Sequence, residues 1–143
     1  MQSIQFLGRS RFLSQNERNR FRKTIETIAK QNKKQIESLV YVFCSDEELL
    51  EMNQEHLDHD TYTDIITFDL GDKQNSIDGE VYISVDRVKE NAMSFHVKQE
   101  DELARVVFHG LLHLLGHKDK TPEQGAAMRL AEDTCLALWR EAD

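Results

Sequence analysis

Proline and cysteine are scarce in this chain of 143 residues, which contains one proline and two cysteines. The cysteines, Cys44 and Cys135, lie far apart, which excludes a disulfide-stabilised scaffold and is typical of a reducing compartment. No apolar run approaches the length of a membrane span, and the N-terminus lacks the basic-then-apolar order of a signal peptide. These absences predict a cytoplasmic protein with no membrane segment.

The rest of the composition is that of an ordinary soluble globular protein, with 39% hydrophobic and 31% charged residues. No linker, repeat or low-complexity stretch divides the chain. Its length is sufficient for one hydrophobic core, and we expect a single domain over residues 1–143.

Positive charge is concentrated near the N-terminus, although the whole chain carries a net charge of −8. Residues 1–34 contain nine lysines or arginines and two glutamates, so this segment carries +7 and the remainder −15. Such asymmetry indicates either a local phosphate-binding face, with Arg18 and Arg22 among its candidates, or simply a solvated helix face.

Three capping boxes, beginning at Ser14, Ser45 and Thr121, predict the starts of three helices. With a helix capped by Asp86, the predicted helices cover about 15–33, 46–57, 87–95, 99–115 and 122–139. Strands are expected at 4–7, 39–44, 65–68 and 81–85, the last two joined by a polar loop containing Gly71 and Gly79. This order predicts an α+β fold with a single mixed sheet of about four strands and about five helices.

The most informative segment is 109–119, HGLLHLLGHKD, at the end of a strongly apolar helix. His109 and His113 are four residues apart and share one helix face, so both imidazoles can reach one ion. Gly116 is suited to ending the helix and turning the chain back. A third ligand from the returning chain would complete three protein ligands and leave one position open, as in catalytic zinc sites. The alternative is a pair of hydrogen-bonded core histidines.

Two residues compete to be that third ligand. Asp119 is ten residues after His109, where the HExxHxxGxxH zinc signature has its last histidine, and a carboxylate is an acceptable ligand. His117 is the softer ligand type but directly follows the turn at Gly116. We therefore favour Asp119 over His117.

Gly110 stands where that signature has the glutamate that serves peptidases as general base. Without this base a peptidase is chemically implausible, whereas the same ligands could still polarise a phosphodiester. The motif therefore indicates metal-assisted hydrolysis of a substrate other than a peptide.

A second polar cluster precedes the strand at 65–68 and includes Asn53, His59, Thr63 and Asp64. It either lines the substrate or orients the ligands, or it is an ordinary turn rich in Asp and Thr. The triplet 78–80, DGE, belongs either to the same cleft or to a hairpin turn.

Taken together, these pieces resemble the YbeY family of bacterial ribosomal-RNA maturation factors, which are metal-dependent endoribonucleases. The resemblance covers about 40–132 and rests on Asn53, 63–68, 79–86, 109–116, Met128 and Glu132. It implies one zinc ion per chain, cleavage of single-stranded RNA, maturation of the 3′ end of small-subunit (16S) ribosomal RNA and ribosome quality control. The implied partners are ribosomal RNA and the small ribosomal subunit.

The chain departs from the family pattern at two points. Asp119 replaces the usual third histidine ligand, and the family's fold would bring this position to the metal, which supports Asp119 over His117. Leu57, preceded by His56, replaces a basic residue that follows an aromatic. If that charge binds phosphate, His59 and the basic N-terminal segment are the candidates to supply it.

We therefore expect a zinc endoribonuclease acting on ribosomal RNA, in which His109 and His113 contribute to catalysis through the metal. Two alternatives remain: a ribosome-assembly factor with a structural metal, and a metal-dependent hydrolase of another substrate.

Overall fold

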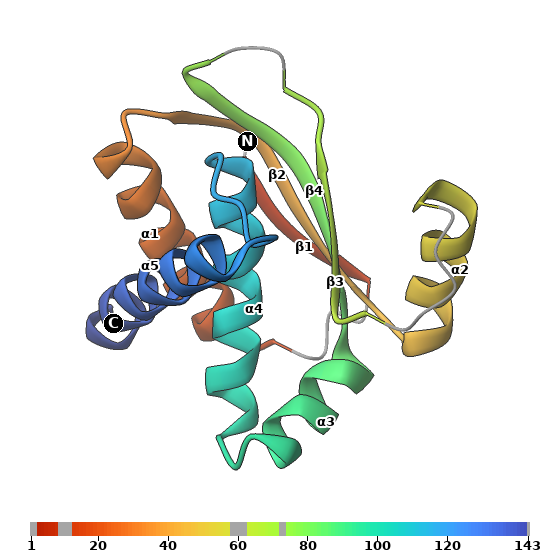
Figure 1. Ribbon diagram of the computed structural model, residues 1–143. Helices are drawn as coiled ribbons and strands as arrows, with labels where there is room; N and C mark the ends of the chain where they lie inside the picture. The colour runs from red at the N-terminus through yellow and green to blue at the C-terminus, as the bar shows by residue number, and fades with distance from the viewer. Residues whose placement is uncertain (1–2, 9–12, 58–62, 72–73, 143) are drawn as a thin grey trace.

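A computed structural model describes residues 3–8, 13–57, 63–71 and 74–142, in which a four-stranded sheet is covered by helices (Figure 1). The elements, in chain order, are β1 (Ile4–Gly8), α1 (Gln15–Gln31), β2 (Gln35–Cys44), α2 (Asp46–Leu57), β3 (Ile65–Asp69), β4 (Ser76–Ser84), α3 (Val85–Ser94), α4 (Gln99–Leu114) and α5 (Pro122–Glu141). This arrangement confirms the predicted α+β class with one mixed sheet.

The strand order in the sheet is β1-β2-β4-β3. β1, β2 and β4 are parallel, and β3 is antiparallel to β4 at one edge. The connection from β1 to its parallel neighbour β2 passes through α1, as a parallel pair requires a crossover. The β3–β4 pair places Asp64, directly before β3, beside the end of β4, because the Ser84 amide donates to the Asp64 carbonyl.

The sheet separates two unequal layers of helices (Figure 1). Helices α1, α4 and α5 lie on one face, α2 lies on the other, and α3 follows the end of β4. The larger layer encloses an aromatic core in which Phe6 stacks on Tyr41 and Phe21 stacks on Trp139. The buried Tyr41 hydroxyl donates to the Val107 carbonyl at 3.0 Å and so fixes α4 against β2.

The three predicted capping boxes are confirmed. In each, the side chain of the capping residue accepts the backbone N–H three residues on, and the side-chain oxygen of that later residue accepts the backbone N–H of the cap. The helix starting at residue 15 ends at Gln31, two residues earlier than predicted, because Lys33 adopts a positive φ of 57°.

Two strands are longer than the apolar runs that predicted them. β2 and β4 begin at Gln35 and Ser76 because Ile36 and Ile77 pair across the two strands and extend the ladder. Gly79, predicted to lie in a loop, is therefore inside β4. The interpretation of 78–80 as a hairpin turn is wrong for the same reason.

The predicted cap of α3 is also wrong. Ser84 is the N-cap, and its hydroxyl accepts the Arg87 N–H at 3.1 Å. The Asp86 carboxylate instead accepts the Asp46 N–H at 2.9 Å, at the start of α2. Sequence spacing cannot reveal this choice, because the partner lies forty residues away.

Within the described residues, no helix is long and apolar enough to cross a membrane.

Candidate metal centre

Helix α4 lies unusually close to the sheet at two glycines. A Cβ atom built on Gly110 would lie 2.8 Å from Val81 Cγ1, and one on Gly79 would lie 2.7 Å from Leu114 Cδ2. Real side chains do not approach so closely, so both positions require a residue that has no side chain. Gly110 therefore faces β4, which adds a packing reason for the absence of a glutamate there.

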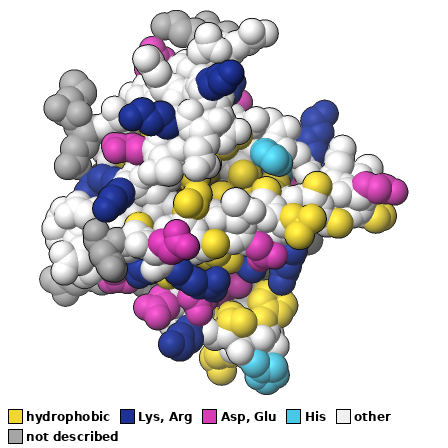
Figure 2. All heavy atoms as spheres, turned by 90° about the vertical axis from the view of Figure 1, so that its left-hand side faces the viewer, with side chains coloured by type: hydrophobic (Ala, Val, Ile, Leu, Met, Phe, Trp, Pro, Cys, Tyr) yellow, Lys and Arg dark blue, Asp and Glu magenta, His cyan; other side chains and the backbone are white. Residues whose placement is uncertain are grey.

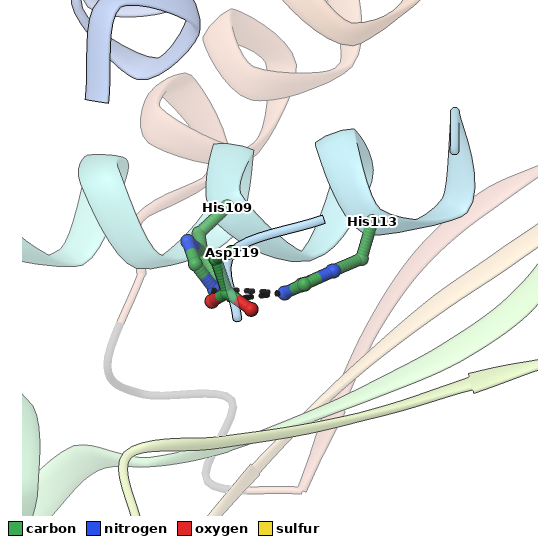
Figure 3. Close-up of side chains that lie close together, drawn as sticks. All are labelled: His109, His113 and Asp119. Carbon is green, nitrogen blue, oxygen red and sulfur yellow. Dashed lines mark hydrogen bonds and ion pairs between the residues drawn. The ribbon is translucent and has the colours of Figure 1, made fainter. Parts of the chain in front are cut away.

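On the same turns of α4, His109 and His113 point towards each other and towards Asp119 (Figure 3). His109 Nε2 and His113 Nε2 are 3.0 Å apart, and Asp119 Oδ2 lies 3.2 Å from the first and 3.4 Å from the second. The chain returns because α4 ends at Leu114 and Gly116 follows with a φ of +99°, a conformation that favours glycine. Asp119 on the returning segment thus meets both imidazoles.

Each imidazole is held by its other nitrogen. Glu132 Oε2 lies 2.6 Å from His109 Nδ1, and the His117 carbonyl oxygen lies 3.0 Å from His113 Nδ1. Because an ionised carboxylate and a carbonyl only accept hydrogen bonds, both Nδ1 atoms donate. The neutral imidazoles consequently direct their Nε2 lone pairs towards each other and towards Asp119.

This donor set fits a metal ion. Ligand atoms that share a tetrahedral ion at about 2.0–2.1 Å lie about 3.3 Å apart, close to the observed 3.0–3.4 Å. Two lone pairs and a carboxylate oxygen at such distances repel one another unless a cation lies between them.

A charged network behind His109 fixes the geometry of its ring. Arg105 donates to Glu132 at 2.8 Å and to Asp133 at 2.7 Å. Burial raises the pKa of Glu132, but hydrogen bonds from His109 and Arg105 outweigh this and hold that pKa below its usual value. Conversely, burial lowers the pKa of His109, but the hydrogen bond and charge of Glu132 outweigh this and raise it in the metal-free protein.

A cavity of about 320 Å³ adjoins His109 and Asp119, and we call it the site cavity. Its described lining comes from the start of β3, from α3, α4 and α5, and from the turn after α4: Asp64, Asn91, Phe95, Glu102, Arg105, Val106, His109, Asp119, Arg129 and Glu132. Burial raises the pKa of both Asp64 and Glu102, and mutual repulsion raises that of Glu102 further. The site cavity thus joins the metal candidates to a strongly charged wall.

The structure brings together some of the residues singled out from the sequence and not others. Asp64 lines the site cavity, whereas Thr63 is half-buried, with its hydroxyl donating to the Ile65 carbonyl. Asn53 is buried in α2. The side chain of His117 is exposed, and only its carbonyl reaches the site.

The two arginines singled out in the basic segment, Arg18 and Arg22, do not contribute to the lining of the site cavity. Both belong to α1. Arg22 donates to the Ile4 carbonyl at 3.1 Å and covers the ring of Phe6. His59 and the side chains of His56 and Leu57 lie outside the described residues.

Sequence reasoning missed the role of Glu132 and the cavity residues Asn91, Phe95, Arg105 and Arg129. For Glu132 a signal existed, because it stands in the apolar stripe of α5 between Met128 and Leu136, at positions four residues apart. A carboxylate in such a stripe requires a buried partner. The other residues carry no comparable pattern.

Comparison with known proteins adds independent findings. A family model described as "Endoribonuclease YbeY" matches residues 8–140. A curated protein of that name from Cytophaga hutchinsonii is 52% identical over 122 residues, covering 85% of each chain. Its counterpart from Porphyromonas gingivalis is 42% identical over 141 residues, covering 99% of this chain and 93% of its own. The solution structure of TM1509 from Thermotoga maritima has a TM-score of 0.64 at 28% identity, over 96% of this chain and 92% of that one.

Proposed function

The chain belongs to the family of endoribonuclease YbeY, and from this membership and the geometry of its site we propose that it is a metal-dependent endoribonuclease. It holds one zinc ion through His109, His113 and Asp119, and it cleaves single-stranded RNA. Its substrate is ribosomal RNA, at the 3′ end of the small-subunit (16S) molecule, which it meets in the cytoplasm with the small ribosomal subunit. Maturation and quality control of ribosomes are the corresponding cellular roles.

One observation carries the proposal: three acceptor atoms converge at 3.0–3.4 Å with both imidazoles fixed from behind. Hydrogen bonds to the Nδ1 atoms are the usual way in which proteins orient histidine ligands. The side chains of His109 and His113 retain 21% and 30% exposure. This exposure supports a site that substrate and water can reach, as catalysis requires, over a closed structural site.

The chain's own groups have definite parts in this chemistry. Glu132 and the His117 carbonyl orient the two imidazoles. Arg105 neutralises Glu132 and so keeps it an acceptor for His109. When bound, a zinc ion lowers the pKa of water to about 7, so that the water is activated, and it polarises the phosphodiester.

The experiment that tests this function compares cleavage of a fluorescent single-stranded RNA by three zinc-loaded proteins. His113→Ala is expected to lose cleavage because it removes one of the convergent nitrogens. His117→Ala is the matched control, because it changes a neighbouring exposed histidine but keeps the backbone carbonyl that holds His113. Equal cleavage by wild type and His113→Ala would refute the proposal.

A further inference from the structure

An exposed aromatic ring lies at the wall of the site cavity. Phe95 ends α3 and retains 59% exposure while lining the cavity with His109 and Asp119. Its backbone N–H donates to the Asn91 carbonyl at 2.9 Å, and Val97 donates to Ala92 at 3.0 Å just beyond it. These hydrogen bonds fix the backbone that carries the ring.

Phe95 belongs to a small apolar surface, but it differs from its neighbours there. Met93 is 77% exposed and Val97 is 46% exposed, yet neither lines the site cavity. Figure 2 shows hydrophobic side chains gathered with a histidine at the lower end of the molecule, where Figure 1 has α3. Charged side chains of both signs lie directly above them. The ring of Phe95 thus borders both the apolar surface and the charged cavity.

Arg129, on α5, adds a cation to the lining of the site cavity. It is exposed on α5, and among the described residues it takes part in no hydrogen bond or ion pair, although its charge lowers the pKa of Glu102. Arg105, the other cavity arginine, is occupied by Glu132 and Asp133. Arg129 is therefore the cavity arginine available to a phosphate.

Asn91, on α3, adds a neutral polar group to the same lining. Its side chain is half-buried, lines the cavity and makes no hydrogen bond to any described residue. An amide both donates and accepts, as the edge of a nucleobase does. The four carboxylates of the lining do not exclude a phosphate at Arg129, because Asp119 and Glu132 have histidine or arginine partners, Glu102 is buried and Asp64 is half-buried.

We propose that the site cavity binds one nucleotide of single-stranded RNA beside the bond to be cleaved, with the base stacked on Phe95, its edge on Asn91 and a phosphate on Arg129. This inference rests on the proposed function and names the residues that select its substrate. About 320 Å³ is at the lower end of ligand pockets, about 300–1,000 Å³, and suits one base. A base can stack on an aromatic ring only when it is unpaired, so this subsite explains a preference for single strands.

The first test measures binding of a fluorescein-labelled single-stranded oligoribonucleotide to the zinc-loaded protein at 4 °C by anisotropy. Phe95→Ala is expected to weaken binding about tenfold, whereas Phe95→Tyr retains the ring and the affinity. Met93→Ala is the matched control, exposed on the same helix but outside the cavity. Wild-type affinity in Phe95→Ala, or equal losses in Phe95→Ala and Met93→Ala, would overturn the proposal; the second result would assign the apolar surface to another partner.

The second test concerns the phosphate. Arg129→Gln should reduce the slope of log affinity against log salt concentration by about 0.7, as expected for one lost contact to a single strand. Arg140→Gln, on the same helix but outside the cavity, should leave the slope unchanged. Equal slopes in wild type and Arg129→Gln would remove Arg129 from the subsite.

A series of oligoribonucleotides with one abasic position each identifies the stacked base. An abasic site at one position should lower the RNA affinity of the wild type about tenfold. The same abasic site should not lower the affinity of Phe95→Ala further, because that variant has already lost the contact. Additive losses at every position would contradict stacking on Phe95. Failure of the proposed function is distinguishable from failure of the subsite. A protein that binds RNA through Phe95 without cleaving it would support the subsite and refute the nuclease activity. A Phe95→Ala variant that cleaves RNA with an unchanged KM would support the nuclease activity and refute the subsite.

Discussion

Helix α1 and the site cavity both contain many charged residues, but these residues make different kinds of contact in the two regions. The Arg20 guanidinium carbon lies 4.2 Å from the centroid of the Trp139 ring, and Arg20 donates to the Trp139 carbonyl. Arg22 lies over the ring of Phe6 and donates to the Ile4 carbonyl. These α1 charges hold the helix to the core and to the chain ends. At the candidate metal centre beside the site cavity, by contrast, the acceptor atoms of His109, His113 and Asp119 converge on one another and not on a part of the hydrophobic core.

The difference teaches that local charge density in a sequence does not by itself locate a functional site. Long cationic side chains often serve as packing, with their stems on apolar surface and their heads on carbonyls or rings. A functional site is marked instead by polar groups whose arrangement costs stability and satisfies nothing within the protein. Five substitutions sharpen this comparison.

The largest effect is expected for Glu132→Gln. Loss of the carboxylate leaves His109 without its charged hydrogen-bond partner and should weaken zinc affinity about 10- to 100-fold. Asp133→Asn is the control, since Asp133 also accepts from Arg105 but forms no ion pair with any histidine of the described residues. Titration of zinc against a competing chelator measures the affinity. Similar losses of zinc affinity in both variants would show that the affinity depends on the ion pairs of Arg105 and not on the orientation of His109.

Gly110→Ala comes next. The added methyl group meets the stiff Val81 side chain at 2.8 Å, so we expect the free energy of unfolding to fall by about 1–3 kcal/mol. Gly125→Ala provides the opposite case, because nothing lies within 4 Å of its added Cβ and alanine favours helix by about 1 kcal/mol. Urea denaturation measures both; equal stabilities of Gly110→Ala and wild type would mean that α4 is not fixed by this contact.

Smaller effects are expected for Arg20→Gln and Arg22→Gln. Each loses a hydrogen bond to a carbonyl and a cation–π contact, so each should lower the free energy of unfolding by about 1 kcal/mol. Their affinity for single-stranded RNA should stay near that of the wild type. A loss of RNA affinity like that of Arg129→Gln, with unchanged stability, would restore the basic segment as the RNA-binding face.

The smallest effect is expected for Glu102→Gln, and it depends on pH. Burial and the charge of Asp64 raise the pKa of Glu102 above its unfolded value. The carboxyl group therefore contributes stability below the ordinary carboxyl pKa and loses it as the pH rises through the raised value. Glutamine, neutral at every pH, should raise the melting temperature at pH 8 and have less effect near pH 4. The same shift at both pH values would contradict burial as the cause.

How far the sequence predicts this molecule follows from the range of each interaction. Capping boxes and the four-residue spacing of His109 and His113 are local, so the helix starts and the facing imidazoles were predictable. The pairing of Ile36 with Ile77, the capping of α2 by Asp86 and the contact of Glu132 with His109 join distant segments. No local pattern specifies such partners, and the same holds for the contacts of Arg20 with Trp139 and of Arg22 with Ile4.

The most direct test of the metal site is zinc titration of the metal-free protein by calorimetry, repeated for Asp119→Ala and His117→Ala. We predict one zinc ion per wild-type chain, much weaker binding in Asp119→Ala and unchanged binding in His117→Ala. Unchanged binding in Asp119→Ala together with weakened binding in His117→Ala would contradict the account, because it would mean that the side chains converging in the structure are not those that hold the ion.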